Sequence, residues 1–253
     1  MDLKIKKYTK KEPIPQRPIS KQKIIPSHAS VTLICGSTNA GKTNLVCNML
    51  TNPYMYGGSS EPCNKKGNNY FDEIYVFSGS KDQTIRQLID DKILEEKNLI
   101  KPDPKEIKKI FDKQEKLLSG KKDVHQIPRI LVILDDCLQY KDFMYSDEVS
   151  QVITSGRHCS ISSWTLTQYF YKVAPVCRTN ADMIIQFRPN RSEINILDQM
   201  YRPAHVEKKK DFVNLINEAI KPTKEDSHPF LVICKSAHPD EMFRRNFDEY
   251  LII

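Results

Sequence analysis

One run of residues has the types and spacing that suit the binding of phosphate groups. Residues 36–43 read Gly-Ser-Thr-Asn-Ala-Gly-Lys-Thr, the pattern G-x-x-x-x-G-K-T, between an apolar run at 31–35 and a helical pattern at 44–50. Glycines let such a loop turn its backbone N–H groups toward phosphate oxygens, and the following helix adds the positive end of its dipole. A plain glycine turn is the alternative, which these flanking elements disfavour.

This loop predicts a bound nucleotide with its phosphates and a Mg²⁺ ion. Lys42 is expected to reach the β- and γ-phosphates, and the Thr43 hydroxyl is expected to ligate Mg²⁺. The residues predicted to bind the nucleotide are Gly36, Ser37, Thr38, Asn39, Ala40, Gly41, Lys42, Thr43 and Asn44.

Two acids follow a second apolar run, and their carboxylate oxygens could bind a metal ion or accept a proton beside such a loop. Residues 130–134 are apolar and lead into Asp135 and Asp136. We expect Asp135 to hold Mg²⁺ and Asp136 to polarise the attacking water as a general base. A further strand at 161–167 ends in Gln168, which can touch the γ-phosphate or the water and report hydrolysis. An acidic turn and a solvent-facing strand end are the simpler alternatives.

The elements around these residues predict an α/β fold. Apolar runs that read as buried strands lie at 31–35, 74–77, 130–134, 161–166, 183–187 and 230–234, and helical patterns lie at 104–119 and 206–220. Continuous apolar runs are typical of a sheet covered on both faces. Strands that alternate with helices over this length predict a doubly wound, mostly parallel sheet flanked by helices.

Charge divides the chain into two parts, an arm at 1–28 and a domain at 29–253. The arm holds eight Lys and Arg against two Asp and Glu, a net charge of +6, while the whole 253-residue chain carries +7. Four prolines in the arm favour an extended segment. Two interpretations stay open: a solvated terminus, or a tether to an anionic surface such as DNA.

Several classes of protein are excluded by composition. The longest apolar runs are about five residues, far below the roughly twenty that span a membrane, and no apolar stretch follows the basic N-terminus as in a secretory signal. The seven cysteines form no Cys-x-x-Cys pair, so a disulfide framework or zinc site is disfavoured and a reducing compartment favoured.

Taken in order, these motifs resemble the FtsK–HerA superfamily of DNA-pumping ATPases, and within it the genome-packaging ATPases of large icosahedral DNA viruses and virophages. The motifs that carry the resemblance are the phosphate loop, the strand ending in Asp135 and Asp136, Gly156-Arg157-His158, Thr167-Gln168-Tyr169, Arg178-Thr179-Asn180 and Phe243-Arg244-Arg245-Asn246-Phe247.

The resemblance implies a RecA-like P-loop domain and a motor that hydrolyses Mg-ATP to move double-stranded DNA into a preformed capsid. It implies a homo-oligomeric ring of five or six subunits, contact with capsid vertex proteins, and a place in the virion or the host cytoplasm. It makes Gln168 the sensor, and it implies an arginine finger from the neighbouring subunit, for which Arg157 is the first candidate and Arg178 the second. Many relatives have Glu where this chain has Asp136, whose shorter side chain must approach the water more closely.

Two segments are candidates for gripping DNA, Lys65-Lys66 and Tyr169-Phe170-Tyr171-Lys172, where aromatic and basic residues adjoin. Packing of Phe170 and Tyr171 in the core is the alternative. Two other functions remain open: a nucleoside or nucleotide kinase, which would need an acceptor pocket and an arginine-rich lid, and a nucleotide-gated capsid assembly factor with little turnover.

Overall fold

The computed structural model describes residues 25–26, 28–52, 55–57, 70–79, 83–120 and 127–251. Most of the predicted arm at 1–28 lies outside these residues, as does Lys65-Lys66, so the arm boundary and that candidate DNA contact stay predictions. Within the described part, Ile25 is buried and Pro26 accepts a hydrogen bond from the Tyr56 hydroxyl at 2.7 Å.

Nine strands of the described residues form one sheet in the order β3-β2-β4-β5-β1-β6-β7-β8-β9. Their bounds are Val31–Cys35 (β1), Glu73–Ser78 (β2), Leu99–Ile100 (β3), Ile130–Asp135 (β4), Ile161–Thr167 (β5), Met183–Phe187 (β6), Phe230–Cys234 (β7), Phe243–Arg245 (β8) and Glu249–Tyr250 (β9). Neighbours from β3 to β6 pair in parallel, and β7, β8 and β9 add an antiparallel extension. The prediction of a mostly parallel sheet is confirmed.

All six strands predicted from apolar runs are present, and three short strands were not predicted. β3 and β9 have two residues each and β8 has three, two of them arginines. Such strands carry no apolar run of the four to eight residues by which a buried strand is recognised. They form because a neighbouring strand offers an unpaired edge, which is a property of the tertiary structure.

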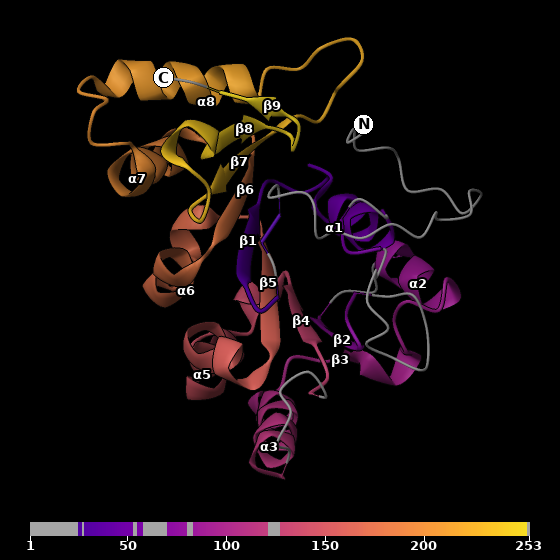
Figure 1. Ribbon diagram of the computed structural model, residues 1–253. Helices are drawn as coiled ribbons and strands as arrows, with labels where there is room; N and C mark the ends of the chain where they lie inside the picture. The colour runs from indigo at the N-terminus through magenta and orange to yellow at the C-terminus, as the bar shows by residue number, and fades with distance from the viewer. Residues whose placement is uncertain are drawn as a thin grey trace.

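Helices cover both faces of the sheet, as Figure 1 shows, with α1 and α2 on one face and α3, α5, α6, α7 and α8 on the other. The helices are Lys42–Thr51 (α1), Gln83–Asp90 (α2), Pro104–Gly120 (α3), Lys141–Met144 (α4), Asp147–Ser155 (α5), Pro175–Asn180 (α6), Arg191–Tyr201 (α7) and Lys209–Ala219 (α8). The helix predicted at 206–220 begins three residues later, because Val206 lies in a turn that bonds back to Pro203.

The central strands are buried on both faces, which explains their continuous apolar sequences. All six residues of β4 and all seven of β5 are buried. Along β5, Trp164 packs among residues of the α1 face, and Ile161 packs among residues of the other face. Because both faces of these strands are closely packed, the residues at the strand ends are held in defined positions.

The carboxyl ends of β2, β4, β5 and β1 meet at one edge of the sheet because these four strands are parallel neighbours. Ligands of open α/β sheets bind outside this edge. The fold therefore brings the phosphate loop, the two acids and Gln168 to a single place. None of the helices in the described part of the chain combines the length and apolar character that crossing a bilayer requires.

Candidate active site

The phosphate loop joins β1 to α1 through backbone conformations that its residue types permit. Gly41 has φ 101°, and Asn39 has φ 62°. Glycine adopts the left-handed region without strain, and Asn tolerates it better than most residues. Gly36 is required for another reason, since a Cβ atom there would lie 2.7 Å from Cβ of Phe187 on β6. The sequence of the loop thus matches its shape.

Lys42 lies over the loop that precedes it. Its Nζ atom donates to the carbonyl oxygens of Gly36, at 2.8 Å, and Ser37, at 3.0 Å. These two bonds hold the ammonium group at the loop, where it can meet phosphate oxygens.

A cavity of about 400 Å³ opens above the loop. It is lined by Thr38, Asn39, Ala40, Gly41, Lys42, Thr43, Asn44, Thr84, Asp135, Asp136 and Gln168. Of the residues predicted to bind nucleotide, metal or water, all except Gly36, Ser37 and the two arginines line this one cavity. Among its described lining residues, Lys42 is the only Lys or Arg. The cavity size, the glycine-containing loop and the ammonium group fit the phosphates of a nucleotide.

The two acids at the end of β4 form hydrogen bonds with residues at the ends of two different neighbouring strands. Asp135 is buried, and its Oδ2 atom accepts a hydrogen bond of 3.1 Å from the hydroxyl of Ser78, at the end of β2. Asp136 has φ 50°, in the left-handed region, and its Oδ2 atom accepts a hydrogen bond of 2.5 Å from the Gln168 amide, after β5. The two carboxylates therefore have different surroundings, and their roles toward a metal and a water molecule stay predictions.

Further hydrogen bonds join the loop to the ends of the neighbouring strands. The amide of Gly36 donates to the carbonyl of Thr167 at 3.1 Å, and the amide of Asp136 donates to Leu166 at 3.1 Å. The Thr38 hydroxyl donates to Gln168 Oε1 at 3.3 Å. The Gln168 side-chain amide thus contacts both the phosphate loop and Asp136. Its role as a sensor of the γ-phosphate stays a prediction.

The oxygen groups at this edge fit a magnesium ion. The Thr43 hydroxyl and the Asp135 carboxylate both line the cavity, and Mg²⁺ prefers oxygen ligands. The neighbouring Cys137 offers sulfur rather than oxygen, which Mg²⁺ disfavours, and burial, followed by the charges of Asp135 and Asp136, raises the pKa of its thiol well above the usual value. Cys137 is one of six described cysteines, all buried and none in a disulfide.

Arg157 lies in a turn at Gly156–Cys159, just before β5. It is therefore at the amino end of this central strand, whereas the cavity is at the carboxyl end. The seven-residue strand separates it from the cavity by roughly 20 Å, so Arg157 cannot reach the cavity of its own chain. Its side chain is exposed and makes no hydrogen bond or ion pair with another described residue. Arg157 therefore cannot act as a finger within its own chain, and its action in a neighbouring subunit stays a prediction.

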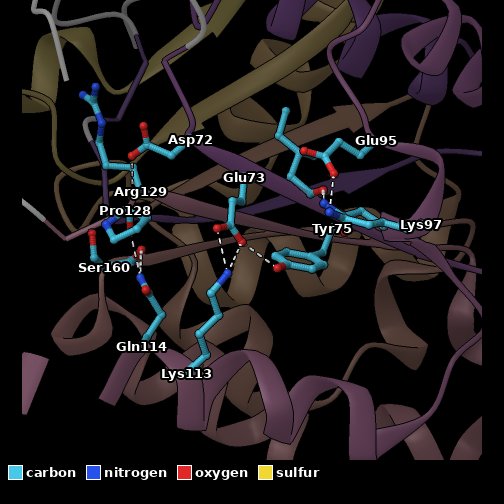
Figure 2. A network of polar contacts seen from close by, with 12 residues as sticks. Asp72, Glu73, Tyr75, Glu95, Lys97, Lys113, Gln114, Pro128, Arg129 and Ser160 are labelled. Atoms are coloured by element: carbon cyan, nitrogen blue, oxygen red, sulfur yellow. Dashed lines mark hydrogen bonds and ion pairs between the residues drawn. The ribbon is translucent and has the colours of Figure 1, made fainter. Parts of the chain in front are cut away.

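The turn that carries Arg157 is held by α3. Gln114, fully buried, donates from Nε2 to the carbonyl oxygens of Pro128, at 2.8 Å, and Cys159, at 2.9 Å. Figure 2 shows this amide between Pro128 and Ser160, beside the ion pair of Lys113 with Glu73. The turn that carries Arg157 is therefore anchored to the core, whereas the Arg157 side chain is exposed.

Arg178, on α6, is engaged within its own chain. Its Nη1 atom donates to the carbonyl oxygens of Phe170, at 3.4 Å, and Tyr171, at 3.3 Å, and its backbone oxygen accepts from Tyr201 at 2.9 Å. Arg178 does not line the cavity. These contacts favour a structural role over that of a finger.

The segment after Gln168 forms a turn at Phe170–Lys172. Phe170 is fully buried, as the packing interpretation expected, whereas Tyr171 is 42% exposed. Lys172 Nζ lies 4.4 Å from the ring centroid of Tyr169. The buried carboxylate of Glu193 accepts from the Phe170 amide at 3.0 Å and so anchors the turn. Its exposed residues remain candidates for DNA contact.

Sequence reasoning missed two residues of this site, Ser78 and Thr84. Ser78 ends β2 and carried the same signal as Gln168, a polar residue at the carboxyl end of an apolar run. Thr84 belongs to α2 and lies six residues after Ser78, the last residue of that strand. Nothing in its sequence context pointed to the cavity, because the folding of α2 beside α1 decides its position.

A comparison with protein-family models gives a match to "Poxvirus A32 protein" over residues 82–249, more than half of the chain. The chain belongs to the poxvirus A32 protein family. The matched region includes Asp135, Asp136 and Gln168, and the phosphate loop lies before it. This membership confirms the resemblance to the viral packaging ATPases of the FtsK–HerA superfamily. A search of curated proteins found no match.

Solved structures confirm the P-loop ATPase fold. The genome packaging NTPase B204 from Sulfolobus turreted icosahedral virus 2, in complex with AMPPCP, is 16% identical, covers 89% of this chain and 98% of its own, and has a TM-score of 0.51. EssC (ATPases 2 and 3) from Geobacillus thermodenitrificans is 15% identical and covers 88% of this chain and 38% of its own, with a TM-score of 0.50. At such identities the similarity concerns the fold.

Proposed function

We propose that this member of the A32 family is an ATPase that hydrolyses Mg-ATP and uses the energy to move double-stranded viral DNA into a preformed capsid. The observation that carries the proposal is one cavity lined by the phosphate loop, two strand-end acids and Gln168. Family membership supports the packaging role, and so does the fold shared with B204, which is described as a genome packaging NTPase.

The chain's own residues divide the chemistry of hydrolysis. The loop amides and the Lys42 ammonium bind the phosphates, and Thr43 and Asp135 hold Mg²⁺, which neutralises charge on the phosphate oxygens. Asp136 accepts a proton from the attacking water. Because the Gln168 amide donates to Oδ2 of Asp136, it fixes the plane of the carboxylate while the other oxygen turns to the water. In the same position, Gln168 registers whether a γ-phosphate is present.

The positive charge that the transition state requires comes, in this proposal, from a neighbouring subunit. Lys42 is the only Lys or Arg among the described residues that line the cavity, and Arg157 is exposed at the opposite edge of the sheet. Arg157 of one subunit would complete the cavity of the next, in a ring of five or six copies. Capsid vertex proteins would anchor this ring, and the protein would act in the virion or the host cytoplasm.

The proposal is tested by measuring ATP hydrolysis with and without double-stranded DNA. Lys42→Ala is the blank, because loss of its ammonium should abolish ATP binding, and Lys141→Ala, an exposed lysine of α4 outside the cavity, is the matched control. A motor would be supported if DNA stimulates ATP turnover, if Lys42→Ala abolishes this turnover, and if Lys141→Ala does not. ATP binding without turnover would contradict the proposal and favour an assembly factor, and phosphate transfer to a nucleoside would favour a kinase.

A further inference from the structure

Ser78 and Asp135 are paired at the ends of two parallel strands. Ser78 is the last residue of β2 and Asp135 the last of β4, and the two stand opposite one another in the strand register. The Ser78 hydroxyl donates to Oδ2 of Asp135 at 3.1 Å. The side chains are deeply buried, with 6% of Ser78 and 4% of Asp135 exposed. The contact is therefore shielded from competing water.

A hydroxyl is well suited to orient a carboxylate that binds a cation. Fixing one oxygen of Asp135 fixes the plane of the whole carboxylate, and so the direction in which it presents its electron pairs. A neutral donor does this without cancelling the negative charge, whereas a Lys or Arg in the same place would repel the metal. Partners of this kind, one step removed from a metal, commonly change its affinity by ten- to a hundredfold, as an order of magnitude.

We propose that Ser78 is a positioning residue for the divalent cation of the active site, acting through Asp135. The inference rests on the proposed function, which makes Asp135 a ligand of Mg²⁺. It extends the site to β2, which contributed no residue to the motifs read from the sequence. Each of the two acids then has its own orienting partner, Ser78 for Asp135 and Gln168 for Asp136.

The test measures Mn²⁺, a spectroscopic substitute for Mg²⁺, binding to the full chain in the presence of AMPPCP by electron paramagnetic resonance. Ser78→Ala should weaken Mn²⁺ binding about 5- to 30-fold, as the loss of a hydrogen bond to a charged group predicts. Affinity for AMPPCP without metal should stay unchanged, because the loop binds the phosphates. Ser78→Thr keeps the hydroxyl and should restore Mn²⁺ affinity to within about twofold of the original.

Ser163→Ala is the matched control, because Ser163 is a fully buried serine of β5 whose hydroxyl makes no hydrogen bond with any other residue that the structure describes. It should leave Mn²⁺ affinity unchanged. Unchanged binding in Ser78→Ala would overturn the proposal, as would equal losses in Ser78→Ala and Ser78→Thr, which would trace the effect to packing. Asp135→Asn, measured in parallel, distinguishes failure of the Ser78 proposal from failure of the proposed function. If Asp135→Asn retains full Mn²⁺ affinity, Asp135 is not a metal ligand and the proposed function is wrong on this point.

Discussion

The side-chain amide of Gln168 donates a hydrogen bond of 2.5 Å to Oδ2 of Asp136, joining the ends of two neighbouring strands. The same amide group accepts a bond from Thr38 in the phosphate loop. One side chain therefore connects the phosphate loop to the Asp136 carboxylate. In the proposed mechanism, this contact links nucleotide binding to the orientation of the general base.

Asp136→Asn should abolish turnover while ATP binding persists. The amide cannot accept the proton of the water, so the hydrolysis rate should fall by about 10²- to 10⁴-fold, whereas the loop and Lys42 still bind the phosphates. Single-turnover hydrolysis and the binding of a fluorescent ATP analogue measure the two effects. Asp142→Asn, an exposed acid of α4, serves as control. A rate for Asp136→Asn near that of the unmodified chain would remove Asp136 from the mechanism.

Arg157 and Arg178 should differ in what their loss affects. Arg157→Ala removes an exposed side chain, so the melting temperature and ATP affinity should stay unchanged while turnover falls by about 10³-fold or more. Arg178→Ala breaks bonds to Phe170 and Tyr171. It should lower the free energy of unfolding by about 1 kcal/mol, a few degrees in melting temperature.

A mixing experiment tests whether Arg157 acts in the neighbouring subunit. Arg157→Ala and Lys42→Ala chains should each be inactive alone. When mixed, a Lys42→Ala subunit can offer its intact Arg157 to the intact cavity of an Arg157→Ala neighbour, so part of the activity should return. If the mixture stays inactive while both chains assemble together, Arg157 does not act across subunits.

His28 should make the stability of the fold depend on pH. Burial, followed by the nearby Arg129 charge, lowers the pKa of His28 to about 4, from 6.5. Its ring nitrogens lie 2.8 Å from the Ser162 hydroxyl and 2.9 Å from that of Ser160. Because the unfolded chain binds the proton more tightly, the stabilisation is fully present above pH 6.5 and is lost as the pH falls toward 4.

Urea unfolding at pH 7 and pH 4.5 measures this effect. The His28 contribution to the free energy of unfolding should fall by about 2 kcal/mol between these pH values. His28→Asn keeps polar atoms but no group that titrates in this range. Between the two pH values, its free energy of unfolding should therefore fall by about 2 kcal/mol less than that of the unmodified chain. An identical pH dependence in both chains would contradict the prediction.

The sequence by itself determined the phosphate-loop motif and the class of fold. The pattern at 36–43 needs only local backbone turns and a following helix, so it could be recognised without the structure. The six long strands were equally visible, because a strand buried on both faces must be apolar throughout. The positions of Asp136 and Gln168 at strand ends followed from the same runs.

Only the tertiary structure decided which of these residues meet. The placement of β2 beside β4 brings Ser78 to Asp135, and the packing of α2 brings Thr84 to the cavity. The structure also distinguishes Arg157 from Arg178, although both are arginines at a similar distance from Gln168 along the chain. Arg157 is exposed, whereas Arg178 bonds to carbonyl oxygens of its own chain. Strand order and helix packing depend on contacts between residues far apart in the chain, and no local pattern records them.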